Sequence, residues 1–191
     1  MARRLAPDER RDLILRQTRQ MITEEGTGGL SFRAVARYCG MSAPGVLHYF
    51  DGLTPLLEAV LDQREEEERA AFLAAIPDNP TLLEWADTVV KVSMSRAKEN
   101  RSFDIMEAQA LGSPEHPAYG WYARKSRHLD ETIELAKKDY PRDPEAVLTV
   151  LGTVVDGLRF SWIRSTEISD YASDWKQVRD TVFAGFEQYR A

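Results

Sequence analysis

The sequence has one cysteine, Cys39, three histidines and no long apolar segment. One cysteine excludes an internal disulfide, which is typical of proteins in a reducing cytosol. No apolar run approaches the roughly 18 to 20 residues that span a bilayer, and the charged N-terminal residues are unlike a signal peptide. These absences predict a cytoplasmic protein with no membrane partner.

Catalytic and metal-binding patterns are also missing. The sequence contains no HExxH, CxxC, GxSxG or phosphate-loop pattern. His48, His116 and His128 are scattered, and the last two are about 120° apart around a helix, so they cannot share a metal on one face. We therefore expect no metal, no cofactor and no enzymatic activity, with a helical enzyme as a remote alternative.

Charge is distributed unevenly along the chain. The first 50 residues contain eight Arg against five Asp and Glu, a balance of +3, although the whole chain has a formal net charge of −6. This asymmetry favours a polyanion at the N-terminal end, with an acidic body behind it.

Apolar residues recur at helical spacing throughout, and strand-like alternation persists nowhere. Nine helices are expected, with breaks at Gly26, at 77–80 and at 112–115. The helix that follows the last of these breaks is expected to reach Asp139. The sequence therefore predicts an all-α protein.

The most informative segment is residues 31–50, SFRAVARYCGMSAPGVLHYF. Two short helices that cross near a right angle need a small residue at their contact and an unhindered backbone in the turn, which Ala36 and Gly40 supply. Ser42 is placed to cap the second helix, with Pro44 in its first turn. The shared apolar face would hold Val35, Cys39, Met41 and Val46. The spacing predicts a helix-turn-helix; the alternative is an unrelated pair of core helices.

These residues resemble the DNA-binding domain of TetR-like regulators. The resemblance covers about the first 60 residues and includes 30–36, 40–42, 48–50 and 56–60. The ending His48-Tyr49-Phe50 is most similar to the betaine-pathway branch. The resemblance implies a homodimeric repressor that places one recognition helix per protomer in the major groove of a near-palindromic operator and is released by a small-molecule effector. It implies a helix-turn-helix domain over 1–53 and a ligand-binding and dimerisation domain over 54–191.

The resemblance also implies which residues meet DNA. The base-reading positions fall on Ala43, Pro44, Gly45 and His48, and the phosphate-facing positions on Ser31, Arg33, Ser42, His48, Tyr49 and Thr54. Ala43 and Pro44 can offer only apolar contact, for example to a thymine methyl. Arg3 and Arg4 are candidates for an additional arm contact.

The sequence departs from the family pattern at three positions of this region. Pro44 replaces a usual glycine, Leu47 a usual aromatic residue and Leu53 a usual lysine. The last change removes a phosphate cation and predicts a shallow salt dependence of DNA binding. The departures keep a second alternative open, in which the protein is an adaptor that binds a partner other than DNA.

The last two expected helices are apolar over broad arcs, more than one core needs. We expect an isologous four-helix dimer interface, with a monomeric core as the alternative. The expected interface residues are Val147, Leu151, Val154, Leu158, Trp175, Val178, Val182 and Phe186.

The effector is expected among the middle helices, where large side chains gather. The candidates are Trp85, Val89, Met94, Phe103, Met106, Trp121, Tyr122, Phe160 and Trp162. Plain core packing is the alternative for each of them. Aromatic rings near Asp104, Glu107 or Asp156 would suit a cationic ligand, and a neutral hydrophobic effector is equally compatible with the list.

Overall fold

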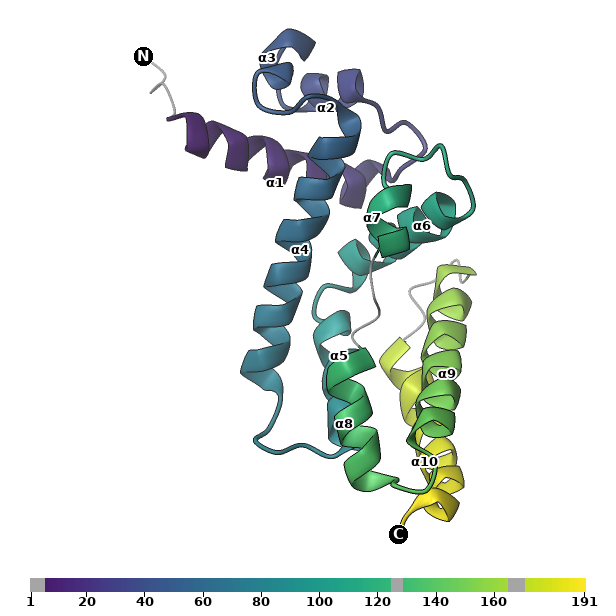
Figure 1. Cartoon of the computed structure of the whole chain (residues 1–191). Coiled ribbons are helices and arrows are strands. Elements are labelled where there is room, and N and C mark those ends of the chain that lie inside the picture. The colour runs from purple at the N-terminus through teal and green to yellow at the C-terminus, as the bar shows by residue number, and fades with distance from the viewer. Residues whose placement is uncertain (1–5, 125–128, 165–170) are drawn as a thin grey trace. The chain divides into compact units, whose positions relative to one another are not determined.

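The computed structural model describes residues 6–124, 129–164 and 171–191. These residues form helices and no strands, which confirms the all-α prediction (Figure 1). The α-helices are α1 (Pro7–Glu25), α2 (Phe32–Tyr38), α3 (Ala43–Leu47), α4 (Leu53–Ala75), α5 (Leu82–Met94), α6 (Ala97–Leu111), α7 (Tyr119–Arg124), α8 (Leu129–Asp139), α9 (Pro144–Arg164) and α10 (Tyr171–Phe186), with a short 3-10 helix over Glu187–Tyr189.

Within the segment expected as one helix up to Asp139, the described residues form α7 and α8, and residues 125–128 lie outside the described part of the chain. The second helix of the helix-turn-helix ends at Leu47, three residues before the end of the segment 31–50, and the chain then turns and places the Phe50 ring in the core.

The chain divides into two compact units, and two of the three boundaries between them fall inside α4 and α6. The first unit comprises residues 1–67 and 102–125, and the second comprises 68–101 and 126–191. The functional division at residue 53 stays a prediction.

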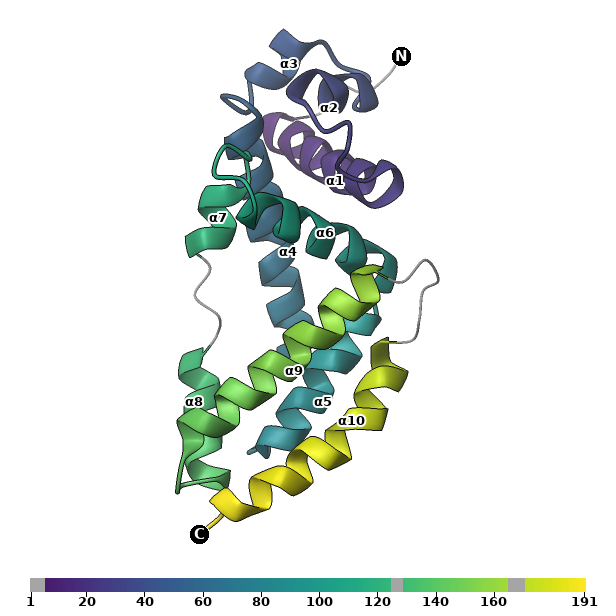
Figure 2. The ribbon, with the colours of Figure 1, turned by 90° about the vertical axis from the view of Figure 1, so that its right-hand side faces the viewer.

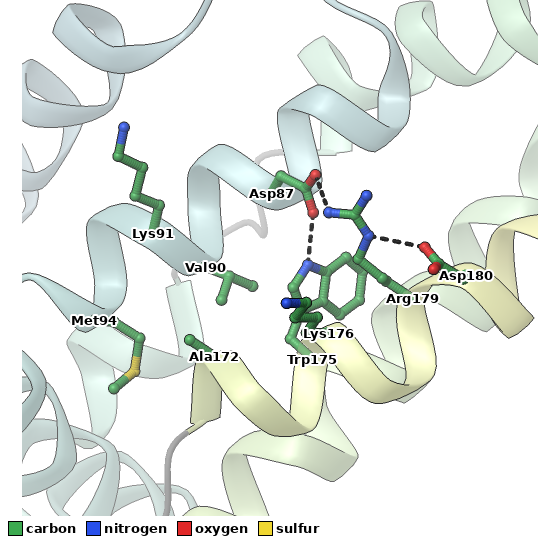
Figure 3. Close-up of a pocket in the computed structure, with 9 residues that line it drawn as sticks. All are labelled: Asp87, Val90, Lys91, Met94, Ala172, Trp175, Lys176, Arg179 and Asp180. Carbon is green, nitrogen blue, oxygen red and sulfur yellow. Dashed lines mark hydrogen bonds and ion pairs between the residues drawn. The ribbon is translucent and has the colours of Figure 1, made fainter.

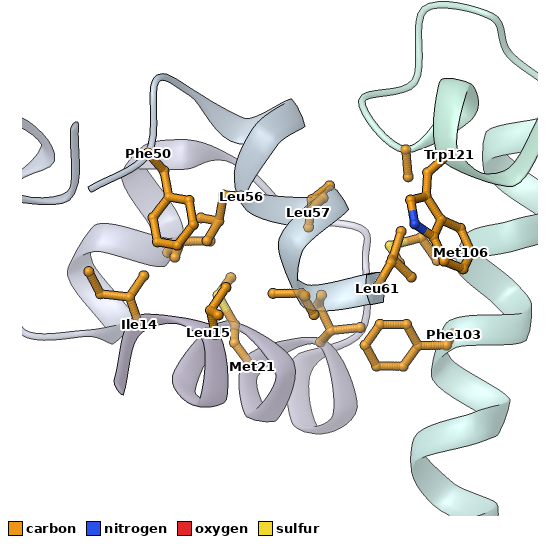
Figure 4. Close-up of a cluster of buried hydrophobic side chains, with 14 of the residues drawn as sticks. Ile14, Leu15, Met21, Phe50, Leu56, Leu57, Leu61, Phe103, Met106 and Trp121 are labelled. Carbon is orange, nitrogen blue, oxygen red and sulfur yellow. The ribbon is translucent and has the colours of Figure 1, made fainter. Parts of the chain in front are cut away.

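The first unit has a continuous apolar core (Figure 4). From α1 it takes the predicted stripe of Ile14, Thr18, Met21 and Ile22, all of them buried. The buried Thr18 hydroxyl donates to the Ile14 carbonyl oxygen at 2.8 Å, so its polar atom is satisfied inside the helix. The core also takes in Leu56, Leu57, Val60 and Leu61 of α4 and Phe103, Met106, Trp121 and Tyr122 of α6 and α7.

Polar contacts attach α7 to α4 within the first unit. The Trp121 indole Nε1 donates to the Asp62 carboxylate at 2.7 Å, and Arg124 pairs with Glu58 at 2.8 Å. Because these bonds join residues about 60 positions apart, they fix α7 on the helix that follows the helix-turn-helix. The helix-turn-helix therefore packs on more of the chain than residues 1–53.

The second unit is built from α5, α8, α9 and α10 (Figure 2). Its core contains Leu82, Val90, Tyr140, Trp162 and Trp175, together with residues of all four helices. A capping box starts α5: the Thr81 hydroxyl accepts from the Glu84 amide at 3.2 Å, and Glu84 accepts from the Thr81 amide at 2.8 Å. This confirms the start that the sequence predicts for this helix.

Helix α9 corrects the expectation that no segment is long and apolar enough to span a bilayer. Its 21 residues, Pro144–Arg164, meet that test by length and composition, and only 17% of the tested stretch is buried. Only part of the apolar surface of α9 is covered: Val147, Leu151 and Trp162 are buried, whereas Val150 and Phe160 are exposed. An apolar surface therefore remains uncovered on α9 in the single chain.

Candidate nucleic-acid interface and effector site

The geometry of α2 and α3 is that of a helix-turn-helix. Gly40 has φ +63°, so the turn uses the left-handed region that glycine adopts at little cost. The Met41 amide closes the turn by donating to the Ala36 carbonyl oxygen at 2.9 Å. Ser31 and Ser42 cap the two helices by accepting from the Ala34 and Gly45 amides, both at 3.2 Å. The predicted turn and cap are confirmed.

The buried face of α3 fixes which side of the helix faces outward. Val46 is fully buried and Phe50 nearly so. The Arg11 guanidinium lies 4.8 Å from the centre of the Phe50 ring, which adds a cation–π contact to its packing. With its inner side anchored at Val46, α3 cannot rotate without opening the core of the first unit.

All nine candidate DNA-contacting residues lie at accessible positions. The six exposed residues are Ser31, Arg33, Ser42, Pro44, His48 and Thr54. The three half-buried residues are Ala43, Gly45 and Tyr49. The rings of His48 and Tyr49 meet edge to face with centroids 5.2 Å apart, so each restricts the other. The roles of these residues in DNA binding stay predictions, and Arg3 and Arg4 lie outside the described residues.

The positions that depart from the family pattern have different environments. Leu53 is half-buried and packs against the core of the first unit, which gives a structural reason for an apolar residue at the start of α4. Leu47 is 48% exposed on α3. The sequence did not mark it as a contact residue, although its place in the recognition helix was the available signal.

Neighbouring residues of α2 serve structure. The Tyr38 hydroxyl donates to the Glu24 carboxylate at 2.8 Å, and that hydrogen bond, with smaller effects of burial and nearby charge, raises the pKa of Tyr38 to about 12. Burial raises the pKa of the half-buried Cys39 thiol. A raised pKa disfavours the reactive thiolate, which supports the prediction that Cys39 is a packing residue.

The nine candidate effector residues are distributed over both units. Phe103, Met106, Trp121 and Tyr122 are buried in the core of the first unit, and Trp162 is buried in that of the second. Trp85, Val89 and Met94 are half-buried on α5, and Phe160 is exposed on α9. For the buried five the packing alternative holds, because large side chains on inward helix faces fill a core before they line a cavity.

A hollow of about 530 Å³ opens in the second unit between α5 and α10 (Figure 3). Of the nine candidates only Met94 lines it. The lining residues are Asp87, Val90, Lys91, Met94, Ala172, Trp175, Lys176, Arg179 and Asp180. Sequence reasoning missed it because the two helices are about 85 residues apart and neither carries a local ligand motif.

The charges in this hollow are partly compensated. Trp175 Nε1 and Arg179 Nη1 donate to the two oxygens of Asp87, at 2.8 and 2.6 Å, and Arg179 Nε donates to Asp180 at 3.0 Å. Both carboxylates thus share one guanidinium. Lys91 and Lys176 are exposed at the rim and form no ion pair with the described part of the chain. The lining has three cationic and two anionic side chains.

The expected dimer residues divide into two groups. Val147, Leu151, Trp175 and Phe186 are buried in the core of the second unit, so the expectation that they meet a partner was wrong. They lie on the sides of α9 and α10 that face the core of the second unit. The other four are half-buried and remain accessible: Val154, Leu158, Val178 and Val182.

No group of three or more His, Cys, Asp or Glu residues is placed to hold a metal ion, as far as the structure describes the chain. His116 lies before α7, where burial lowers its pKa, and His128 is outside the described residues.

Comparisons with known proteins give the following relations. Residues 14–60 match the family model of the bacterial regulatory proteins of the tetR family. A comparison with curated protein sequences gave no match. A solved structure of a protein assigned to the TetR-family transcriptional regulators, from a Rhodococcus species, is similar with a TM-score of 0.70 at 21% identity, covering 91% of this chain and 98% of that one.

Two further solved structures extend the likeness. AibR, crystallised with isovaleryl coenzyme A and operator DNA, has a TM-score of 0.63 at 18% identity, with 92% and 97% of the two chains covered. NalD of Pseudomonas aeruginosa, the secondary repressor of a multidrug efflux pump, has a TM-score of 0.63 at 18% identity, with 94% and 97% covered.

These relations agree with the geometry of α2 and α3. The fold is that of TetR-family regulators over nearly the full length of the chain, and the N-terminal module is a tetR-family DNA-binding domain. The family match is confined to residues 14–60, and the likeness over the rest of the chain is one of fold.

Proposed function

We propose that the protein is a homodimeric repressor that binds a near-palindromic operator and is released by a small-molecule effector. The observation that carries this proposal is α3, which is capped by Ser42, anchored by Val46 and accessible at Pro44, Leu47 and His48. A capped helix that presents one side of its surface from a rigid module is what major-groove recognition requires.

Fluorescence anisotropy with labelled DNA from upstream of the protein's own gene tests this function. A repressor of this type retains the fragment against an excess of competitor DNA. The variant Arg33→Ala should weaken binding, whereas Arg142→Ala, which removes an exposed arginine of the second unit, should leave it unchanged. An adaptor or a helical enzyme would lose the fragment to the competitor.

The dimer is proposed to form through the outward sides of α9 and α10, which lie side by side in the second unit (Figure 2). The exposed apolar residues there include Val150 and Phe160, whereas the four half-buried candidates also pack against the core of the second unit. Gly157 is exposed between them, so a partner backbone can approach α9 closely at that point. An apolar surface of this kind, uncovered in one chain, is typical of an interface between copies.

The effector is proposed to bind in the hollow between α5 and α10. Val90, Met94, Ala172 and Trp175 give it an apolar floor, and Lys91 and Lys176 add positive charge at its rim (Figure 3). Arg179 pairs with both carboxylates of the lining but offsets only one of their two charges. With Lys91 and Lys176 included, the lining has three positive and two negative side chains, and this excess of positive charge favours an anion. We therefore infer an effector with a carboxylate or similar group on a small apolar body.

Titration of the protein–DNA complex with three kinds of compound tests this effector class. Short-chain carboxylates should release the DNA, whereas quaternary amines and neutral hydrophobes of equal size should not. Lys176→Gln should weaken the effect of the carboxylate about tenfold, the loss of one charge-assisted hydrogen bond. Lys137→Gln, which changes a lysine on α8, should not. Release by quaternary amines alone would support the cationic ligand and the betaine-pathway branch instead.

Two points of the sequence analysis belong to this proposal without a structural test of their own. The betaine-pathway branch depends only on His48-Tyr49-Phe50. A cytoplasmic location follows from the proposed role in transcription. The uncovered face of α9 is assigned to a second copy of the chain rather than to lipid.

A further inference from the structure

The outward side of α3 is apolar where a DNA-reading helix usually carries hydrogen-bonding groups. Pro44, Leu47 and His48 are exposed and lie within about 100° of one another around the helix axis. Val46 lies on the opposite side and is fully buried. Two of the three outward side chains can neither donate nor accept a hydrogen bond.

The other residues near this surface have little capacity to read bases. Gly45 has no side chain, and a Cβ atom there would lie 3.1 Å from the Ser42 Oγ and 3.5 Å from the Met41 Cε. Ser42 Oγ already accepts from the Gly45 amide as the helix cap. Of the side chains on this outward surface, only the His48 ring brings a polar atom.

Leu47 lies on the side of α3 that faces away from the core. It is one position beyond Val46, and the anchored helix directs it away from the packed side. Single exposed apolar side chains are common on soluble proteins. It is therefore the place of Leu47 on the outward side of α3, and not its exposure alone, that makes it available for a contact with DNA.

One apolar group projects from base edges into the major groove, the 5-methyl group of thymine. We propose that Leu47, with Pro44 beside it, reads thymine methyl groups, so that A·T pairs at one position of each half-site are selected by apolar contact. This inference depends on the proposed function. It adds a specificity-determining residue, Leu47, and predicts the chemistry of the operator.

Uracil substitution isolates this contact, because deoxyuridine lacks only the 5-methyl group and keeps both hydrogen-bonding edges of thymine. The probe is a duplex selected by the full-length protein from a random pool, synthesised again with deoxyuridine at one thymine position at a time. At the position that Leu47 contacts, loss of the methyl group should lower affinity about fourfold per half-site. Thymine positions beyond the reach of Leu47 and Pro44 should show no change.

Protein variants assign the effect to Leu47. In Leu47→Ala the ratio between thymine and uracil duplexes should fall to about one, while His48→Ala should lower affinity for both duplexes and keep the ratio. Leu73→Ala is the matched control, because Leu73 is a similarly exposed leucine on α4 in the second unit. It should keep both the affinity and the ratio, and all three variants should retain the melting temperature of the parent.

Three different results test the methyl contact, its assignment to Leu47 and the proposed function. A thymine-to-uracil ratio near one at every position in the parent protein overturns the methyl contact, and a ratio that persists in Leu47→Ala overturns its assignment to Leu47. If no duplex is enriched from the pool, the proposed function itself fails.

Discussion

Helices α3 and α9 both present apolar side chains outward, but for different reasons. Helix α3 has five residues, a serine cap and one buried anchor, so its outward side follows from its length and from the turn at Gly40. Helix α9 has 21 residues and carries apolar residues on more than one side. The comparison teaches that a short helix held by turn chemistry has one possible orientation, whereas a long helix with apolar residues on more than one side has several.

The inner side of α9 gives the largest expected effect. Trp162→Ala should lower the free energy of unfolding by about 3–5 kcal/mol, because it empties a fully buried site in the core of the second unit. Trp162→Phe should cost much less, since the indole N–H has no hydrogen-bond partner within the described residues. Chemical denaturation measures both. If the alanine variant were as stable as the parent, Trp162 would not support the core, and it would again be a candidate for effector binding.

The outer side of α9 gives the next effect. Phe160→Glu should raise the dimer dissociation constant on the order of a hundredfold, because a symmetric interface would bring two buried charges together. Leu73→Glu is the control, because Leu73 and Phe160 are both 54% exposed in the single chain. Sedimentation equilibrium separates the two variants. A Phe160→Glu protein that remains as dimeric as the control would place the interface elsewhere.

On α3, loss of the cap should cost less. Ser42→Ala should destabilise the first unit by about 1 kcal/mol, because the Gly45 amide loses its acceptor. Ser42→Asp should keep the cap and the melting temperature but weaken DNA binding, since its charge would face phosphates. Equal loss of stability in both variants would contradict the capping role.

Arg33 is expected to contact phosphate, so its loss should reduce the salt dependence of DNA binding as well as its strength. Arg33→Gln should reduce the slope of log affinity against log salt by about 0.9 per protomer. The slope of the parent should already be shallow, because Leu53 packs in the core and adds no cation. Anisotropy at several salt concentrations measures both slopes. A steep slope for the parent would contradict the prediction that the leucine at position 53 removes a phosphate contact.

The smallest effect concerns pH. Hydrogen bonds from Thr81 lower the pKa of Glu84 in the folded state. Its contribution to stability is therefore present above the ordinary carboxyl pKa and is lost as the pH falls through the lowered value. Glu84→Gln should make stability less sensitive to acid in that range, measured as melting temperature between pH 7 and pH 3. An unchanged profile would indicate that the capping box does not form.

The sequence analysis predicted the helix-turn-helix well, because its constraints are local. Gly40 allows the positive φ of the turn, and Ser42 caps the second helix. Val46 lies within this short helix on the side that joins the core. Each requirement involves neighbours in the sequence, so spacing alone could identify it.

The second unit was predicted less well, because its arrangement depends on distant contacts. Periodicity grouped Val147 and Leu151 correctly on one side of a helix, but it could not show whether that side met the chain's own core or a partner. The hollow had no sequence signal at all, since Asp87 and Arg179 meet only after α5 and α10 pack.

The most direct test of the account is hydroxyl-radical footprinting of the protein on a duplex that it has selected. The account predicts two protected half-sites on one side of the duplex, related by approximate two-fold symmetry and separated by one or more whole helical turns. Both half-sites should disappear together in Phe160→Glu. A single unpaired footprint, or protection that competitor DNA abolishes, would contradict a dimer that reads DNA through α3.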